Sequence, residues 1–161
     1  MLKLFSKLFG SSKSEKDVQQ IMPIIQKINQ FYEQYQQLTN DELRNKTQEF
    51  KQRIQSYLTD IDQEIAAKKQ EAESLPENEI HNRDTIYQQV DKLKKERDKK
   101  IEEILAQIQP EAFAVVKETS RRFKENPEMV STATPLDREL SVKKEHIRIE
   151  GDKSIFKNTW I

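Results

Sequence analysis

The chain has 161 residues, of which 35% are charged and 34% hydrophobic, and it contains only two glycines. This composition excludes a compact sheet protein and favours long exposed helices, because such helices bury only a narrow apolar seam. Its 28 basic residues balance its 28 acidic ones, so no net field favours nucleic acid as a partner. The absence of cysteine excludes disulfides and thiolate metal sites.

The first predicted element is an amphipathic segment within residues 1–13. Large apolar side chains beside lysines predict contact with an anionic membrane surface, where the apolar groups enter the interface and the lysines meet the headgroups. The candidate membrane-contact residues are Leu2, Lys3, Phe5, Lys7, Leu8 and Phe9. Packing of this face onto the rest of a larger protein explains the pattern equally well. No apolar run reaches the roughly 20 residues that a membrane-spanning helix needs.

Two helices are predicted next. The first begins at Ser14 and carries apolar residues at three- and four-residue steps, and Pro23 within it predicts a bend or a later start. Thr39 and Glu42 then match a capping box, in which each side chain accepts a hydrogen bond from the other residue's amide. From there a long helix runs to at least Ala72, with an apolar seam of Leu43, Thr47, Phe50, Ile54, Tyr57, Ile61 and Ile65.

Residues 59–109 are predicted to form an antiparallel coiled-coil hairpin. Apolar seams continue on both sides of a short break at residues 75–78, and Pro110 interrupts the second helix. A separate helix is expected over residues 110–125. Its apolar face is expected to be buried against a protein body and contains Phe113, Val116, Ser120 and Phe123.

Residues 126–161 are predicted to hold a linker followed by a small β-hairpin. Two prolines and many small polar residues over 127–141 indicate the linker. Residues 146–150 alternate apolar and polar side chains, and Gly151 with Asp152 provides a turn into a second strand. The expected fold class is therefore mainly all-α, with elongated helices and a small C-terminal β-hairpin.

The sequence offers no pattern for catalysis. His81 and His146 stand alone, and two glycines separated by most of the chain cannot build a loop that holds phosphate. Acidic pairs such as Asp60 and Asp62 lie among lysines, which favours solvated ion pairs over acid–base chemistry. We therefore expect no cofactor or metal site in this chain, and no enzymatic activity from the chain alone.

Four segments resemble one known family. Residues 110–123 (PEAFAVVKETSRRF) and residues 38–50 (LTNDELRNKTQEF) are similar to helices of the SecA family of protein-export motors. Residues 1–12 (MLKLFSKLFGSS) and residues 23–29 (PIIQKIN) resemble further stretches of that family in the same order. Residues 59–109 and 125–161 are expected to be additions to the usual family pattern.

The resemblance implies a parent protein that binds ATP and Mg²⁺ and couples ATP hydrolysis to the export of preproteins through the SecYEG channel. That parent is cytoplasmic and peripheral on the cytoplasmic face of the membrane. Residues 14–58 and 110–125 would belong to its first nucleotide-binding domain, whereas the ATP-binding loop is expected beyond residue 161. A homodimer is compatible with the helical seams. The alternative is a stand-alone coiled-coil interaction protein without catalytic activity.

Overall fold

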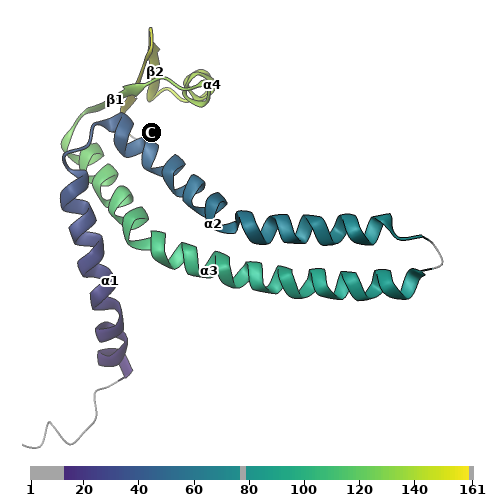
Figure 1. Ribbon diagram of the computed structural model, residues 1–161. Coiled ribbons are helices and arrows are strands. Elements are labelled where there is room, and N and C mark those ends of the chain that lie inside the picture. The colour runs from purple at the N-terminus through teal and green to yellow at the C-terminus, as the bar shows by residue number, and fades with distance from the viewer. Residues whose placement is uncertain (1–12, 77–78, 160–161) are drawn as a thin grey trace, which may run out of the picture. The chain divides into compact units, whose positions relative to one another are not determined.

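The computed structural model describes residues 13–76 and 79–159. The elements are α1 (Lys13–Tyr35), α2 (Asn40–Ser74), α3 (Ile80–Glu125), β1 (Glu128–Thr132), α4 (Pro135–Lys143), β2 (Ile147–Glu150) and β3 (Lys153–Lys157) (Figure 1). Over the described residues the fold is mainly α-helical with a small antiparallel sheet near the C-terminus, which confirms the predicted fold class.

The chain divides into two compact units. One comprises Met1–Leu43 with Pro110–Ile161, and the other comprises Arg44–Gln109. We call the first the sheet-bearing unit and the second the helical hairpin. Because α2 and α3 are long, each of them contributes residues to both units.

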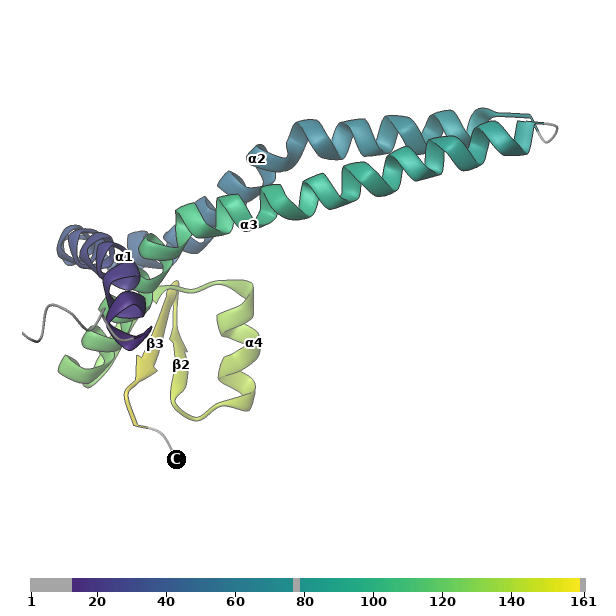
Figure 2. The ribbon, with the colours of Figure 1, turned by 90° about the horizontal axis from the view of Figure 1, so that it is seen from below.

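The helical hairpin is formed by α2 and α3 lying side by side in both views (Figures 1 and 2). Its core consists of buried Leu58, Ile61, Ile65 and Val90, with Ile54, Leu93 and Ile101 packed against it. The predicted seam of α2 placed Tyr57 inside, which is wrong, because Tyr57 is exposed and Leu58 is buried instead. The Tyr57 hydroxyl donates to Glu103 Oε2 at 2.8 Å, so its polar end is satisfied at the surface.

In the sheet-bearing unit, α1 packs against the C-terminal part of α3. The core there is Tyr35, Leu43 and Ala114, with Ile28, Phe31, Tyr32, Leu38 and Val115 against it. The helix α1 continues through Pro23. The predicted capping box before α2 is confirmed: the Thr39 amide donates to Glu42 Oε2 at 2.7 Å, and the Glu42 amide donates to Thr39 Oγ1 at 3.2 Å.

Two predictions about α3 are wrong. The helix does not stop at Pro110 but runs on as one helix to Glu125. A proline deprives the carbonyl four residues earlier of its hydrogen bond, yet Pro110 is itself buried, and packing outweighs that loss. The face expected to be buried is also exposed: Phe113 is 55% and Val116 is 64% exposed. The buried side carries Ala114, Glu118 and Arg122.

The predicted linker is wrong as well, because residues 127–141 form β1 and α4. The Thr134 side chain accepts from the Asp137 amide and Asp137 accepts from the Thr134 amide, which gives α4 a capping box of its own. The predicted hairpin is confirmed as β2 and β3, joined by Gly151 at φ 59 and Asp152.

The three strands form an antiparallel sheet in the order β1-β3-β2. β1 therefore lies at one edge, and its register places Val130 opposite Ile155, which in turn faces Arg148 on β2. Helix α4 packs beside β2 (Figure 2). The sheet core includes Ser131 and Ser154, whose hydroxyls lie 3.0 Å apart.

Candidate functional site

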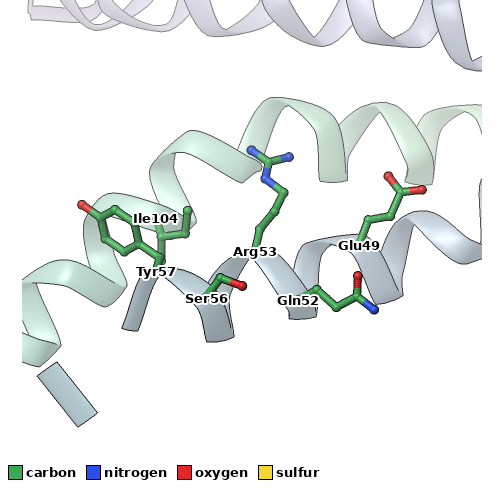
Figure 3. Close-up of a pocket in the computed structure, with 6 residues that line it drawn as sticks. All are labelled: Glu49, Gln52, Arg53, Ser56, Tyr57 and Ile104. Carbon is green, nitrogen blue, oxygen red and sulfur yellow. The ribbon is translucent and has the colours of Figure 1, made fainter. Parts of the chain in front are cut away.

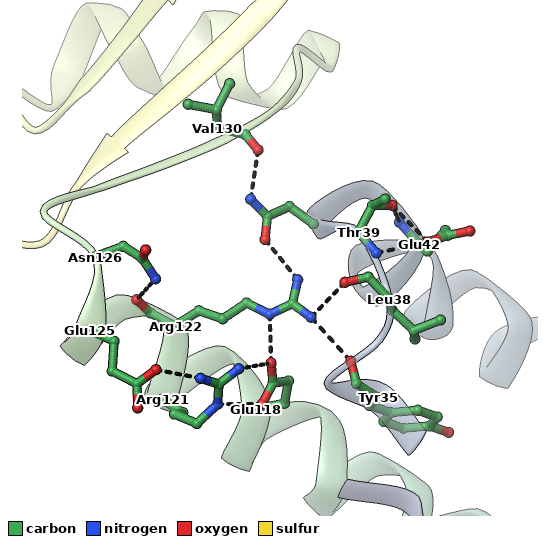
Figure 4. Close-up of polar contacts among 11 residues, drawn as sticks. Tyr35, Leu38, Thr39, Glu42, Glu118, Arg121, Arg122, Glu125, Asn126 and Val130 are labelled. Carbon is green, nitrogen blue, oxygen red and sulfur yellow. Dashed lines mark hydrogen bonds and ion pairs between the residues drawn. The ribbon is translucent and has the colours of Figure 1, made fainter. Parts of the chain in front are cut away.

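The most connected polar site of the sheet-bearing unit lies around Arg122 near the end of α3 (Figure 4). Its guanidinium is buried and donates to two backbone carbonyls, those of Tyr35 at 3.0 Å and Leu38 at 2.7 Å. It also donates to Glu118 Oε1 at 2.7 Å and to Asn40 Oδ1 at 2.8 Å. The Tyr35 carbonyl belongs to the last residue of α1 and the Leu38 carbonyl follows the helix. Carbonyls at a helix C-terminus lack the amide donors of a further turn, and a cation is favourable there. We call these five residues the Arg122 junction.

Glu118 supplies the negative charge of the junction and is fully buried. Arg121 donates to both of its carboxylate oxygens, at 2.8 and 2.7 Å, and Arg122 shares one of them. The hydrogen bond from Arg121 is the largest cause that lowers the pKa of Glu118, and the bond from Arg122 acts in the same direction against the opposing effect of burial. Glu118 therefore stays ionised, and Arg121 also pairs with Glu125.

The N-terminus of α2 connects the junction to the sheet. Asn40 Nδ2 donates to the Val130 carbonyl at 2.8 Å. Asp41 accepts from both the amide and the hydroxyl of Thr132, each at 2.7 Å. Because β1 is an edge strand, these contacts satisfy backbone groups that a neighbouring strand would otherwise bind. The arrangement fixes positions and contains no nucleophile with an adjacent base.

A shallow groove lies on the helical hairpin, lined by Glu49, Gln52, Arg53, Ser56, Tyr57 and Ile104 (Figure 3). The first five side chains come from α2 at helical spacing, and Ile104 comes from α3. The Tyr57 ring is already engaged: Lys100 Nζ lies 5.4 Å from its centroid. The hydrogen bond to Glu103 raises the pKa of Tyr57, so this phenol is a poor proton donor at neutral pH.

The membrane-contact residues predicted from the sequence lie outside the described residues. His81 is exposed in the first turn of α3, and His146 lies in the turn before β2. Over residues 13–76 and 79–159, no three histidine or acidic side chains gather so that they could hold a metal ion. No helix in the same part of the chain is long and apolar enough to cross a membrane.

Sequence reasoning missed the Arg122 junction. The available signal was local: Glu118 is followed by arginines at positions i+3 and i+4, which places both on its own side of a helix. Nothing local shows that Arg122 also reaches Asn40, 82 residues away.

Comparisons with known proteins agree on one family. The SecA DEAD-like domain model matches residues 5–134. Proteins named protein translocase subunit SecA are 44% identical over 160 residues in Amoebophilus asiaticus and 45% over 157 residues in Phocaeicola vulgatus. The one from Cytophaga hutchinsonii is 35% identical over 161 residues. No solved structure matches the chain significantly.

The alignments cover 99%, 96% and 100% of this chain but only 14% of each relative. The chain thus spans about one seventh of the length of these relatives. The aligned ranges extend across the helical hairpin, so these relatives carry corresponding sequence there. Because the family model matches well over half of the residues, the chain belongs to the SecA family of protein translocase subunits.

Proposed function

We propose that this chain is the N-terminal part of a SecA-like translocase subunit and provides its parent with a scaffold and a membrane contact. The parent couples ATP hydrolysis to the export of preproteins through SecYEG. The observation that carries the proposal is the match of nearly the whole chain to proteins named protein translocase subunit SecA. The same membership disfavours a stand-alone coiled-coil protein.

The scaffold role is supported by the Arg122 junction. One buried guanidinium binds the end of α1, the start of α2 and the end of α3, while Asn40 extends the contacts to β1. Buried charged groups that are fully hydrogen-bonded allow few alternative arrangements. Elements from three parts of the sequence are therefore fixed to one another within the sheet-bearing unit.

The membrane contact is assigned to residues 1–10, which precede α1. The apolar residues Leu2, Phe5, Leu8 and Phe9 would enter the interface, with Lys3 and Lys7 at anionic headgroups. The far end of α1 is bound by Arg122 through the Tyr35 carbonyl. Together with membership of the SecA family, this assignment supports a peripheral position on the cytoplasmic face of the membrane as part of the proposal.

ATP and Mg²⁺ are assigned to other parts of the parent. The two glycines of this chain, Gly10 and Gly151, are too far apart to form a glycine-rich phosphate loop. We therefore expect the purified 161-residue chain to hydrolyse no ATP. Specific turnover that follows the protein through purification would contradict this assignment.

Co-sedimentation with vesicles tests the membrane contact. The 161-residue chain should pellet with vesicles that contain phosphatidylglycerol, and the double variant Phe5→Asp and Leu8→Asp should lose most of that binding, because two charges would enter the apolar interface. The matched control is Leu136→Asp with Val142→Asp, two residues that are already 58% and 86% exposed on α4. Equal binding by all three proteins would refute the contact.

A further inference from the structure

The edge strand β1 directs alternate backbone groups away from the sheet. Its register with β3 extends past the ends of the strands, where the Ala133 amide donates to the Asp152 carbonyl and the Asn158 amide donates to the Pro127 carbonyl. The odd-numbered residues of β1 are therefore the ones that bond to β3, because an antiparallel strand bonds to each neighbour through alternate residues. The amides and carbonyls of the even-numbered residues lie at the outer edge.

The start of α2 covers only the C-terminal half of that outer edge. Asn40 donates to the Val130 carbonyl, and Asp41 accepts from the Thr132 amide. Within the part of the chain that the structure describes, no hydrogen bond reaches the Val130 amide or the backbone amide and carbonyl of Glu128. These three groups follow one another as donor, acceptor and donor, which is the pattern that a further strand binds. We call them the open edge of β1.

The open edge borders a pocket of the sheet-bearing unit. The pocket has a volume of about 450 Å³ and is lined by Glu128, Met129 and Val130 of β1, together with Leu38, Arg122 and other mostly polar residues. Figure 4 shows Leu38, Arg122 and Val130, which come from the three parts of the chain that surround it. Its size falls within the roughly 300–1,000 Å³ of ligand sites. An extended backbone laid along β1 therefore finds both space and hydrogen-bond partners.

We propose that an extended segment of a partner polypeptide binds the open edge as a fourth, antiparallel strand. Antiparallel pairing is slightly more stable per residue than parallel pairing. The partner residue opposite Glu128 exchanges two hydrogen bonds with it, and the carbonyl of the residue opposite Val130 accepts from the Val130 amide. Such main-chain bonds supply the affinity in strand addition, while the side chains select the sequence.

The surroundings of the open edge select the side chains of the partner. Opposite Glu128 a lysine is favoured, because the cation that Glu128 now binds, Arg148, is shared with Glu150. Opposite Val130 a proline is favoured, since Asn40 already binds the Val130 carbonyl and a second amide donor would lack an acceptor. The residue between them faces the other side of the sheet, where valine suits an extended strand. The favoured segment is therefore Pro-Val-Lys in chain order.

A second copy of this chain fits the open edge poorly. Two β1 strands paired about a twofold axis would place Glu128 opposite Glu128, and like charges directly opposite each other destabilise a sheet. The other registers pair Val130 with Val130 or with Glu128. Both of them need the Val130 carbonyl, which Asn40 already binds.

Titration of the isotope-labelled 161-residue chain with the peptide TTPVKTT, blocked at both ends, tests the proposal by NMR. We expect saturable shifts of the Glu128 and Val130 amide resonances, and hydrogen exchange at both amides should slow by about threefold to tenfold, as one typical hydrogen bond allows. The Ala133 amide already donates to Asp152 and is the internal control. The same peptide methylated on the backbone nitrogen of its lysine cannot donate to the Glu128 carbonyl and should bind about tenfold more weakly.

Two variants of the chain separate edge pairing from other modes of peptide binding. Val130→Pro removes the amide that the peptide needs, and an edge strand tolerates proline where the amide points away from the sheet. The peptide-induced shift at Glu128 should be lost, while unchanged Ala133 and Asn158 resonances show that β1 still pairs with β3. Val130→Thr keeps the amide and is the matched control, which should bind the peptide as the unaltered chain does.

The proposal is overturned if the peptide shifts neither Glu128 nor Val130, if the methylated peptide binds equally well, or if binding persists in folded Val130→Pro. Slower exchange at both amides on raising the protein concentration without peptide would make a second copy the occupant and overturn it as well. Because Val130→Pro leaves residues 1–10 unchanged, it should pellet with vesicles as before. This proposal and the membrane contact can therefore fail independently.

Discussion

Arg122 and Asn40 are joined by a hydrogen bond of 2.8 Å although 82 residues separate them in the sequence. Asn40 is the first residue of α2, and its amide nitrogen donates in turn to the Val130 carbonyl on β1. One arginine near the end of α3 thus fixes the start of α2 and, through the Asn40 side-chain amide, the edge strand β1. The contact links residues 127–132, whose local sequence signal for a strand is weak, to the start of α2.

Replacing Arg122 with alanine should destabilise the sheet-bearing unit strongly. The change leaves the buried Glu118 with only Arg121. It also removes the guanidinium donor of the Leu38 carbonyl and one of the two donors of the Tyr35 carbonyl, which keeps the Leu38 amide at 3.2 Å. Breaking a buried charge pair typically costs about 3–5 kcal/mol. Urea unfolding followed by circular dichroism at 222 nm measures the loss.

Two further variants serve as comparisons for the stability loss of Arg122→Ala. Arg122→Lys should recover only part of the stability, because an ammonium cannot spread its donors over four acceptors as a guanidinium does. Lys143→Ala removes an ion pair with Glu139 in which both side chains are more than 60% exposed, so it should cost less than about 1 kcal/mol. Equal losses for Arg122→Ala and Lys143→Ala would mean that the junction does not hold the unit.

Glu118 should make the free energy of unfolding depend on pH in the acid range. The pKa of its carboxyl is lowered from the usual 4.5 in the folded chain, so the unfolded chain takes up the proton first as the pH falls. The contribution of Glu118 is fully present above pH 4.5 and is lost as the pH falls through the lower folded pKa. Glu118→Gln should be less stable at neutral pH and should lose less stability on acidification. Parallel unfolding curves for the two proteins across that range would contradict the assignment.

Sequence patterns predicted the structure correctly where the contacts that form an element lie close together in the sequence. The Thr39 capping box and the turn at Gly151 lie within four residues of their partners, and both were predictable. The predicted helix end at Pro110 was wrong because the sequence shows the cost of a proline to a helix but not the burial of Pro110 in the folded chain.

Burial and long-range contacts account for the remaining errors. Residues 127–132 look like a linker in the sequence because the partners of β1 are distant. The strand pairs with β3 on one side, and on its free edge the Thr132 amide donates to Asp41, 91 residues away. The face of α3 with the most apolar residues was expected to be buried, but the ion pairs of Glu118 occupy the inner side instead. The capping box at Thr134 was a readable local signal that predicted α4, and sequence reasoning passed over it.

Replacing Asp41 with alanine should loosen the edge of β1 without unfolding the sheet. The Thr132 amide loses a 2.7 Å hydrogen bond to a carboxylate. Such charged hydrogen bonds are worth about 1.5–3 kcal/mol, so hydrogen exchange at the Thr132 amide should accelerate by about tenfold or more. The neighbouring Ala133 amide donates to the Asp152 carbonyl instead and serves as the internal control. Equal acceleration at both amides would indicate a general opening of the sheet and contradict a role limited to the edge.

The helical hairpin should depend on its apolar core far more than on its ion pairs. Leu58 is buried among Ile61, Ile65 and Val90, and truncating a buried leucine to alanine costs about 2–5 kcal/mol, because it removes apolar contacts and leaves a cavity. Arg97 bridges to Asp62 with both side chains at least one third exposed, and such pairs contribute about 0–1 kcal/mol because water screens them. Urea unfolding of Leu58→Ala and Arg97→Ala compares the two directly. If Arg97→Ala costs as much as Leu58→Ala, the ion pair and not the apolar seam holds the two helices together.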